Sequence, residues 1–262
     1  MIGRLFGDRR RIAALRRIDR PAAIGLAILQ ALVAAVGWFV EPIWLAAAVA
    51  AQLVLGGIGA VWVMGPARSH LGLARYAIPA MAGIAATLFG RLIPGGLAVL
   101  LVPIVAVLLW SVTYLELRAE GGAGGRTMRD LLLTLMVFAG VAGLFALFGM
   151  QTWPTPLALV ALLVLPATMR SAELRGRLGA EGFGQALVHV LAVSQIGAAA
   201  ILLDLPIAAT AALIALAFYT WAGAADALGQ GASGRSVAVE FGSLVLIGLV
   251  VGLVVGPILA AR

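Results

Sequence analysis

Four ionisable residues lie in or beside long apolar segments of the chain: Arg75, Glu116, His189 and Glu240. Ionisable groups in membrane-spanning segments are costly, and they often mark a functional site. Because all four fall near segment ends on one predicted side of a membrane, we predict a cytoplasm-facing polar cavity in which Arg75 pairs with Glu116 or Glu240, near His189. Such a group could act on a lipid-linked substrate at the membrane surface. In the alternative interpretation, each side chain reaches the lipid headgroups separately or forms a structural pair.

The last apolar segment contains Gly248, Gly252 and Gly256, which are spaced four residues apart. Glycines at this spacing share one helix face and let another helix backbone approach closely. Two interpretations remain open. The face packs against a helix of the same chain, or it forms an interface with a second subunit, identical or different.

The predicted middle of the membrane holds only mildly polar groups: Gln30, Gln52, Thr87, Ser194 and Gln195. We expect them to form hydrogen bonds between helices. Carriers driven by protons or sodium usually place a carboxylate near this depth. This sequence does not, which argues against that class of transporter.

Motifs for metal or cofactor chemistry are missing from the sequence. There is no cysteine, and the two histidines, His70 and His189, do not make a haem-binding pair because His70 is in a loop. The aspartates form no D-x-x-D-like cluster of the kind that holds Mg²⁺ and diphosphate in intramembrane transferases. Neither the H-E-x-x-H zinc motif nor a Walker A motif occurs. We therefore predict no metal and no cofactor.

The composition excludes a water-soluble domain. Hydrophobic residues make up 63% of the 262 residues and charged residues 11%, whereas soluble domains are about half apolar and one quarter charged. A spanning helix needs about 20 apolar residues, and nine such runs occur. We predict an all-α, polytopic transmembrane bundle with spans at residues 22–40, 43–64, 72–90, 92–115, 131–149, 154–169, 184–203, 205–225 and 237–260.

All 18 basic residues are arginines, and the formal net charge is +7. Seven arginines lie in residues 1–21 and nine in alternate loops and helix ends, so 16 of the 18 fall on one side. The positive-inside rule places that side, and the N-terminus, in the cytoplasm. We expect residues 1–21 to form a polybasic arm on anionic lipid headgroups, and residues 22–262 to form one transmembrane domain. Basic residues in such short loops indicate a membrane partner and no nucleic acid.

Three inner loops begin alike, after the fourth, sixth and eighth predicted spans. Each starts with an acidic residue, in the sequences Glu116-Leu-Arg118, Glu173-Leu-Arg175 and Asp226-Ala-Leu228. The pattern favours either a repeated helical hairpin or the shared chemistry of short membrane turns. Both interpretations remain open.

Two classes of function follow from these observations. The first is a non-enzymatic membrane component, either a permease-like or lipid-handling protein or a subunit embedded in a larger complex. The second is a membrane-embedded enzyme that acts on a lipid-linked substrate at the cytoplasmic interface. The arginine-only basic content and the abundance of alanine and glycine indicate a GC-rich genome, and so a bacterial inner membrane.

Overall fold

The computed structural model describes residues 20–65, 72–117, 123–149 and 154–260. The predicted polybasic arm therefore lies almost wholly outside the described residues. We call inner the end of the bundle at which the first described helix begins, following the orientation predicted from the arginines. The helices are α2 (Arg20–Phe39), α3 (Pro42–Leu53), α4 (Gly59–Met64), α5 (Ala77–Gly90), α6 (Gly95–Leu117), α7 (Ala123–Phe148), α8 (Thr155–Leu174), α9 (Gly179–Leu202), α10 (Ile207–Gly229) and α11 (Gly234–Ala260).

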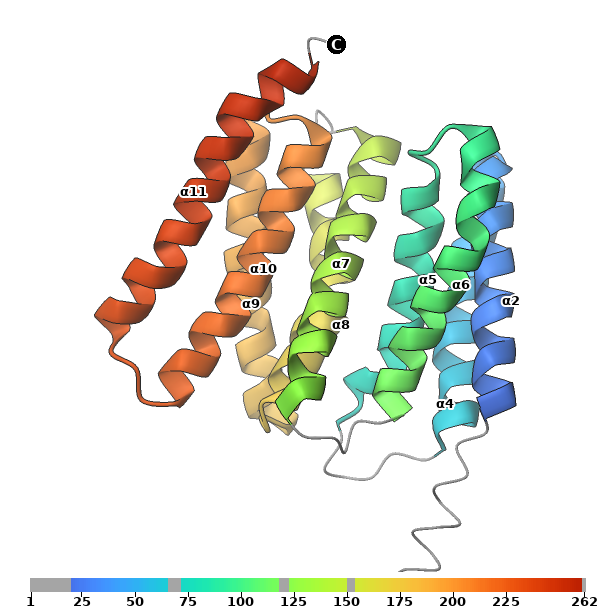
Figure 1. Cartoon of the computed structure of the whole chain (residues 1–262), viewed down its shortest axis with the longest axis horizontal. Helices are drawn as coiled ribbons and strands as arrows, with labels where there is room; N and C mark the ends of the chain where they lie inside the picture. The colour runs from blue at the N-terminus through green and yellow to red at the C-terminus, as the bar shows by residue number, and fades with distance from the viewer. Residues whose placement is uncertain (1–19, 66–71, 118–122, 150–153, 261–262) are drawn as a thin grey trace, which may run out of the picture.

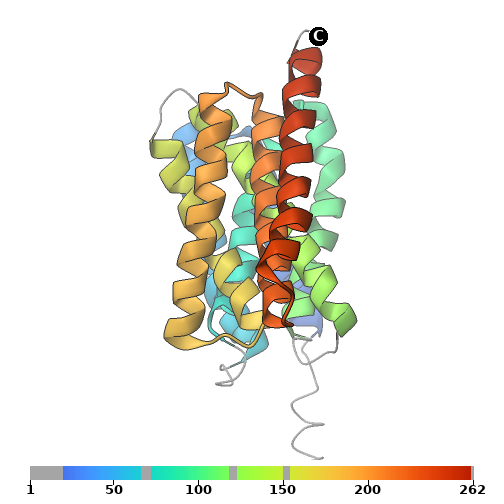
Figure 2. The ribbon, with the colours of Figure 1, turned by 90° about the vertical axis from the view of Figure 1, so that its left-hand side faces the viewer.

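The predicted helical transmembrane bundle is confirmed. A π-helical turn, η1 (Val54–Ile58), joins α3 and α4 into one continuous segment, so the described residues form nine helical segments at the nine predicted positions. Eight of them are long and apolar enough to cross a membrane. The helices run roughly along one axis (Figure 2). The last helix ends at the outer end, opposite the start of α2, as an odd number of crossings requires (Figure 1).

The segment predicted at residues 72–90 differs from the other eight. It consists of a 3-10 turn, η2 (Ala74–Tyr76), followed by α5 with only 14 residues. Of these, 11 are buried within the protein. Because α5 is enclosed by other helices and not by lipid, it does not need the length that a lipid-facing helix needs to match the bilayer.

The enclosed helix α5 packs against α2, α3, α6 and α7. Helix α7 packs in turn on α8 and α10, while α9 packs on α8 and α10. The last helix, α11, packs on α10 at one edge of the molecule, and α2 lies at the opposite edge (Figure 1). The order of the bundle therefore places α5 and α7 between two outer groups of helices.

Glycines let the helices around α5 come into backbone contact. A Cβ atom added at Gly56, within the π-helical turn, would overlap the backbone of Ala80 in α5. A Cβ at Gly83 would overlap the side-chain amide of Gln52. Close helix contact through small residues is the usual means of association in a membrane, where burial of apolar surface gives little driving force.

Midspan polar groups connect α2, α3 and α5. Gln30 donates from Nε2 to the carbonyl of Pro79 at 2.9 Å. Gln52 donates from Nε2 to the carbonyl of Gln30 at 2.8 Å and to Oγ1 of Thr87 at 3.2 Å. The three side chains Gln30, Gln52 and Thr87 are fully buried. The prediction of interhelical hydrogen bonds is confirmed for these residues.

At the outer end, Arg91 and Trp38 join α2 to α5. Arg91, just after α5, donates from Nη1 to the carbonyls of Gly37 and Val40, both at 2.8 Å. These carbonyls lie at the C-terminal end of α2, where the helix itself supplies no donor and a cation is favourable. Trp38 donates from Nε1 to the carbonyl of Ala86 at 3.0 Å.

Candidate functional site

A buried ion-pair network lies at the inner end of the bundle. Nη2 of Arg170 in α8 is 2.6 Å from Oε2 of Glu116 in α6, and its Nη1 is 3.1 Å from Oε2 of Glu173. The Arg170 side chain is 2% exposed. Oε1 of Glu173 accepts a hydrogen bond from the backbone N–H of Ala74 at 2.9 Å. Arg170 and Glu173 therefore hold the ends of α6, α8 and η2 together.

A second arginine extends the network to α7 and α10. Nη2 of Arg175 is 3.1 Å from Oδ2 of Asp130 in α7, and its Nε is 2.9 Å from Oδ1 of Asp226 in α10. Arg175 also donates to the carbonyl and the hydroxyl of Ser171, at 2.8 and 2.6 Å. Two arginines thus hold four carboxylates. A buried ion pair contributes little net stability, but removal of one partner leaves an uncompensated charge inside the protein.

The predicted pairing of Arg75 with Glu116 or Glu240 is replaced by another. Glu116 is buried as predicted, but its cationic partner is Arg170. Arg75 is also buried, with its guanidinium 5.1 Å from the ring centre of Tyr76, and no ion pair joins it to either carboxylate in the described part of the chain. Glu240 is exposed on α11. Glu116 pairs with Arg170 because α8 continues past the predicted end at residue 169. Arg170 is therefore part of the helix and is buried within the bundle.

His189 lies apart from Glu116, between α9 and α10. Its Nε2 is 3.1 Å from the carbonyl of Phe218, and its ring stacks on Phe218 and Trp221 at 4.9 and 6.1 Å between ring centres. It lines a small cavity with Arg175. The structure therefore separates His189 from the residues with which it was predicted to act.

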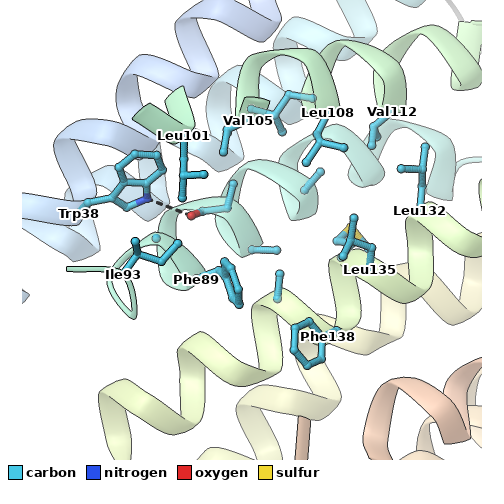
Figure 3. Close-up of a pocket in the computed structure, with 17 residues that line it drawn as sticks. Trp38, Phe89, Ile93, Leu101, Val105, Leu108, Val112, Leu132, Leu135 and Phe138 are labelled. Carbon is cyan, nitrogen blue, oxygen red and sulfur yellow. Dashed lines mark hydrogen bonds between the residues drawn. The ribbon is translucent and has the colours of Figure 1, made fainter. Parts of the chain in front are cut away.

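An apolar cavity of about 160 Å³ opens between α6 and α7 (Figure 3). The two helices make little direct contact, and α5 forms the floor between them. Figure 3 shows Leu101 and Leu108 on one wall and Leu135 and Phe138 on the other. We call this cavity the α6/α7 groove; it is lined by Trp38, Ala82, Ala85, Ala86, Phe89, Gly90, Ile93, Leu101, Val105, Leu108, Leu109, Val112, Leu132, Leu135, Met136, Phe138 and Ala139.

A second, much smaller cavity adjoins the inner end of this groove. We call it the inner cavity; its volume is about 10 Å³ and it is lined by Ile78, Val112, Leu115, Glu116, Arg129, Leu132, Leu133 and Met136. Three of these residues, Val112, Leu132 and Met136, also line the groove. Glu116 and Arg129 are 3% and 6% exposed. Glu116 and Arg129 therefore line a small cavity that shares part of its wall with the apolar groove.

A wider groove of about 740 Å³ lies between α9 and α11, with α10 as its floor. Arg177, Gln185 and Trp221 are among the residues that line it. Helix α11 closes one side of this groove and packs on α10 through Gly248, where an added Cβ would overlap Leu216. Gly248 therefore contacts a helix of the same chain, while the surroundings of Gly252 and Gly256 are outside the described part of the structure.

Sequence reasoning missed the two arginines that organise the network. Arg170 and Arg175 are two of the nine arginines in the alternate loops and helix ends, which indicate only the cytoplasmic side. The usable signal was the acidic residue that begins each of three inner loops, because Glu116, Glu173 and Asp226 are all members of the network.

The chain matches no protein-family model, no curated protein and no solved structure.

Proposed function

We propose that this multi-pass membrane protein is a non-enzymatic lipid-handling protein, which takes a hydrocarbon chain of a membrane lipid into the α6/α7 groove. The observation that supports this most directly is that the apolar groove and the inner cavity with Glu116 and Arg129 share a wall, formed by Val112, Leu132 and Met136. A lipid has the same division into an apolar chain and a charged headgroup. A bacterial inner membrane, with the N-terminal arm on anionic headgroups, is the proposed setting.

The shape and chemistry of the groove suit a hydrocarbon chain. On α6 the lining runs from Leu101 to Val112, about 16 Å at 1.5 Å per residue. Apolar cavities in proteins stay dry, so water is a poor occupant of this space. The gap between α6 and α7 would let a chain enter from the surrounding bilayer, without crossing a polar barrier.

The energetics assign different roles to the two parts of the site. A lipid chain already lies in hydrocarbon, so its transfer from the bilayer to an apolar groove gains little hydrophobic free energy. The groove therefore selects by shape and packing, whereas the polar contacts at the inner end supply most of the preference for one lipid over another. A protein with this division would hold one lipid in a defined orientation.

Filling the groove tests this proposal. Leu101→Trp places an indole among the lining residues, whereas Leu100→Trp places one on the outside of the same helix, where Leu100 is 69% exposed. We expect wild type and Leu100→Trp to retain one lipid after gentle purification, measured by native mass spectrometry. Leu101→Trp should retain roughly tenfold less, equivalent to about 1.4 kcal/mol in binding. Equal retention by the two variants, or none by wild type, would contradict the proposal.

A second candidate function is an embedded subunit that meets its partner through α11. Only 6% of the apolar window of this helix is buried within the chain. Leu246 and Val250 are exposed on it, at 60% and 51%. If α11 binds another subunit, Leu246→Trp should shift a complex isolated in mild detergent to the mass of the single chain. A wild-type protein that already has the mass of one chain would argue against this function.

A further inference from the structure

We infer that the groove between α9 and α11 binds one anionic phospholipid from the leaflet at the inner end of the bundle, with the lipid phosphate on Arg177 and a hydrocarbon chain between the two helices. We call this space of about 740 Å³ the α9/α11 groove. No residue lines both this groove and the α6/α7 groove. The inference therefore concerns a second site, and it does not depend on lipid binding at the first.

The α9/α11 groove lies in the inner half of the bundle and separates two uncovered helix faces. Its lining comes from residues 184–188 of α9 and 234–245 of α11, and these two helices make little direct contact. Helix α11 leans away from the bundle at its inner end (Figure 1). Gly184 and Gly242 stand on the two walls, and nothing lies within 4 Å of a Cβ added at either position. The lack of side chains at both glycines keeps the groove wide.

The walls of the α9/α11 groove are mainly apolar. Val188 of α9, Trp221 of α10 and Val245 of α11 are among its lining residues, and all three lie in candidate membrane spans. Water is a poor occupant of apolar space, and lipid surrounds these helices in a membrane, so we place a hydrocarbon chain here. Such a chain gains little hydrophobic free energy by leaving the bilayer. A preference for one lipid must therefore come from the polar groups of the groove.

Arg177 supplies a cation at the inner end of the groove. Its nearest acid is Glu181, with 3.9 Å between Nε and Oε1, and the Glu181 side chain is 76% exposed. An exposed pair at this distance is weak, so the guanidinium can bind phosphate oxygens through its planar fork of donors. Asp226, the acid at the end of α10, is held by Arg175 at 2.9 Å. In a zwitterionic headgroup the lipid's own ammonium already offsets the phosphate charge, so Arg177 favours a phosphate without that partner.

Gln185 adds a polar group deeper in the groove. Its Oε1 is buried, and no hydrogen bond joins its side-chain amide to another group in the part of the chain that the structure describes. An amide offers two N–H donors as well as an acceptor, so it can bind the ester carbonyl of a phospholipid. Arg177 precedes α9, Gln185 stands in its second turn, and Val188 follows. This order matches the phosphate, ester and hydrocarbon chain of a lipid.

The test adds phosphatidylglycerol or phosphatidylcholine with matched chains to detergent-purified Leu101→Trp protein, in which the α6/α7 groove is filled, and counts bound lipids by native mass spectrometry. We expect one phosphatidylglycerol to bind at least fivefold more tightly than phosphatidylcholine. Arg177→Gln should abolish this preference. Arg235→Gln removes an exposed arginine beside Gly234, a residue that lines the groove, and should change the preference by less than twofold. An unchanged preference in Arg177→Gln would overturn the assignment of the phosphate to Arg177.

Filling the groove tests where the chain lies. Gly242→Leu places a side chain in open space on the wall of the groove, whereas Gly25→Leu does so on the exposed face of α2. We expect Gly242→Leu to bind phosphatidylglycerol at least fivefold more weakly and Gly25→Leu to bind it normally. Equal binding by the two variants would overturn the inference. Binding to wild type but not to Leu101→Trp would assign the lipid to the α6/α7 groove instead, and displacement by soluble glycerol phosphate would exclude a lipid-specific site.

Discussion

Replacing Arg170 with methionine is expected to lower the free energy of unfolding by roughly 3–5 kcal/mol, because two buried carboxylates would lose their cationic partner at once. Glu116 and Glu173 lie 2.6 and 3.1 Å from the Arg170 guanidinium. Both carboxylate side chains are buried, so neither can reach water unless the inner end of the bundle opens. The change is measured by reversible unfolding in detergent, with circular dichroism as the signal.

Two controls separate lost pairing from lost volume. Arg177→Met removes an arginine that is 33% exposed and lies 3.9 Å from Glu181, and a surface pair of this kind contributes at most about 1 kcal/mol. Adding Glu116→Gln and Glu173→Gln to Arg170→Met should recover most of the lost stability, since no unpaired charge then remains buried. If Arg170→Met is as stable as Arg177→Met, the buried ion pairs of Arg170 do not contribute to the free energy of unfolding.

A single methyl group at Gly56 is expected to destabilise the protein by roughly 3 kcal/mol or more, because it would overlap the backbone of α5. A Cβ at this position meets Cα and N of Ala80. Backbone atoms cannot rotate away as a flexible side chain can, so α5 would have to separate from the π-helical turn. Gly56→Ala should therefore lower the midpoint of thermal unfolding strongly.

The neighbouring glycine supplies the matched control. Gly57 lies in the same π-helical turn, and nothing lies within 4 Å of a Cβ added there. Gly57→Ala should be neutral or stabilising by about 0.5–1 kcal/mol, since alanine loses less backbone freedom than glycine in a helix. Equal destabilisation by the two substitutions would mean that the turn itself, and not its contact with α5, determines the cost.

The fold was predictable because apolar length is a local property of the chain. Each lipid-facing helix must form its own backbone hydrogen bonds and be long enough to cross the bilayer. Both properties can be inferred from a run of consecutive apolar residues. The exception is α5, whose surroundings are protein. Its short helix could not be inferred from hydropathy, because burial by other helices and burial by lipid select the same apolar residues.

The candidate site was only partly predictable, because pairing between helices depends on their relative positions. Glu116 is a candidate from the sequence because it lies beside the inner end of a predicted span. Its partner Arg170 follows the apolar run of the sixth predicted span, so the sequence places it only among the arginines of the inner loops and helix ends. One further turn of α8 changes the environment of Arg170 from water to protein. The α6/α7 groove had no sequence signature, since its lining consists of the same apolar residues that elsewhere face lipid.

The enclosed position of α5 also has a consequence for the order in which the protein assembles. During synthesis α5 emerges before α6 and α7, the helices that later cover two of its sides. Until they are made, a 14-residue helix has neither the length to cross the bilayer comfortably nor the neighbours that enclose it. We therefore expect α2 and α3 alone to hold α5 at first, and α6 and α7 to complete its enclosure.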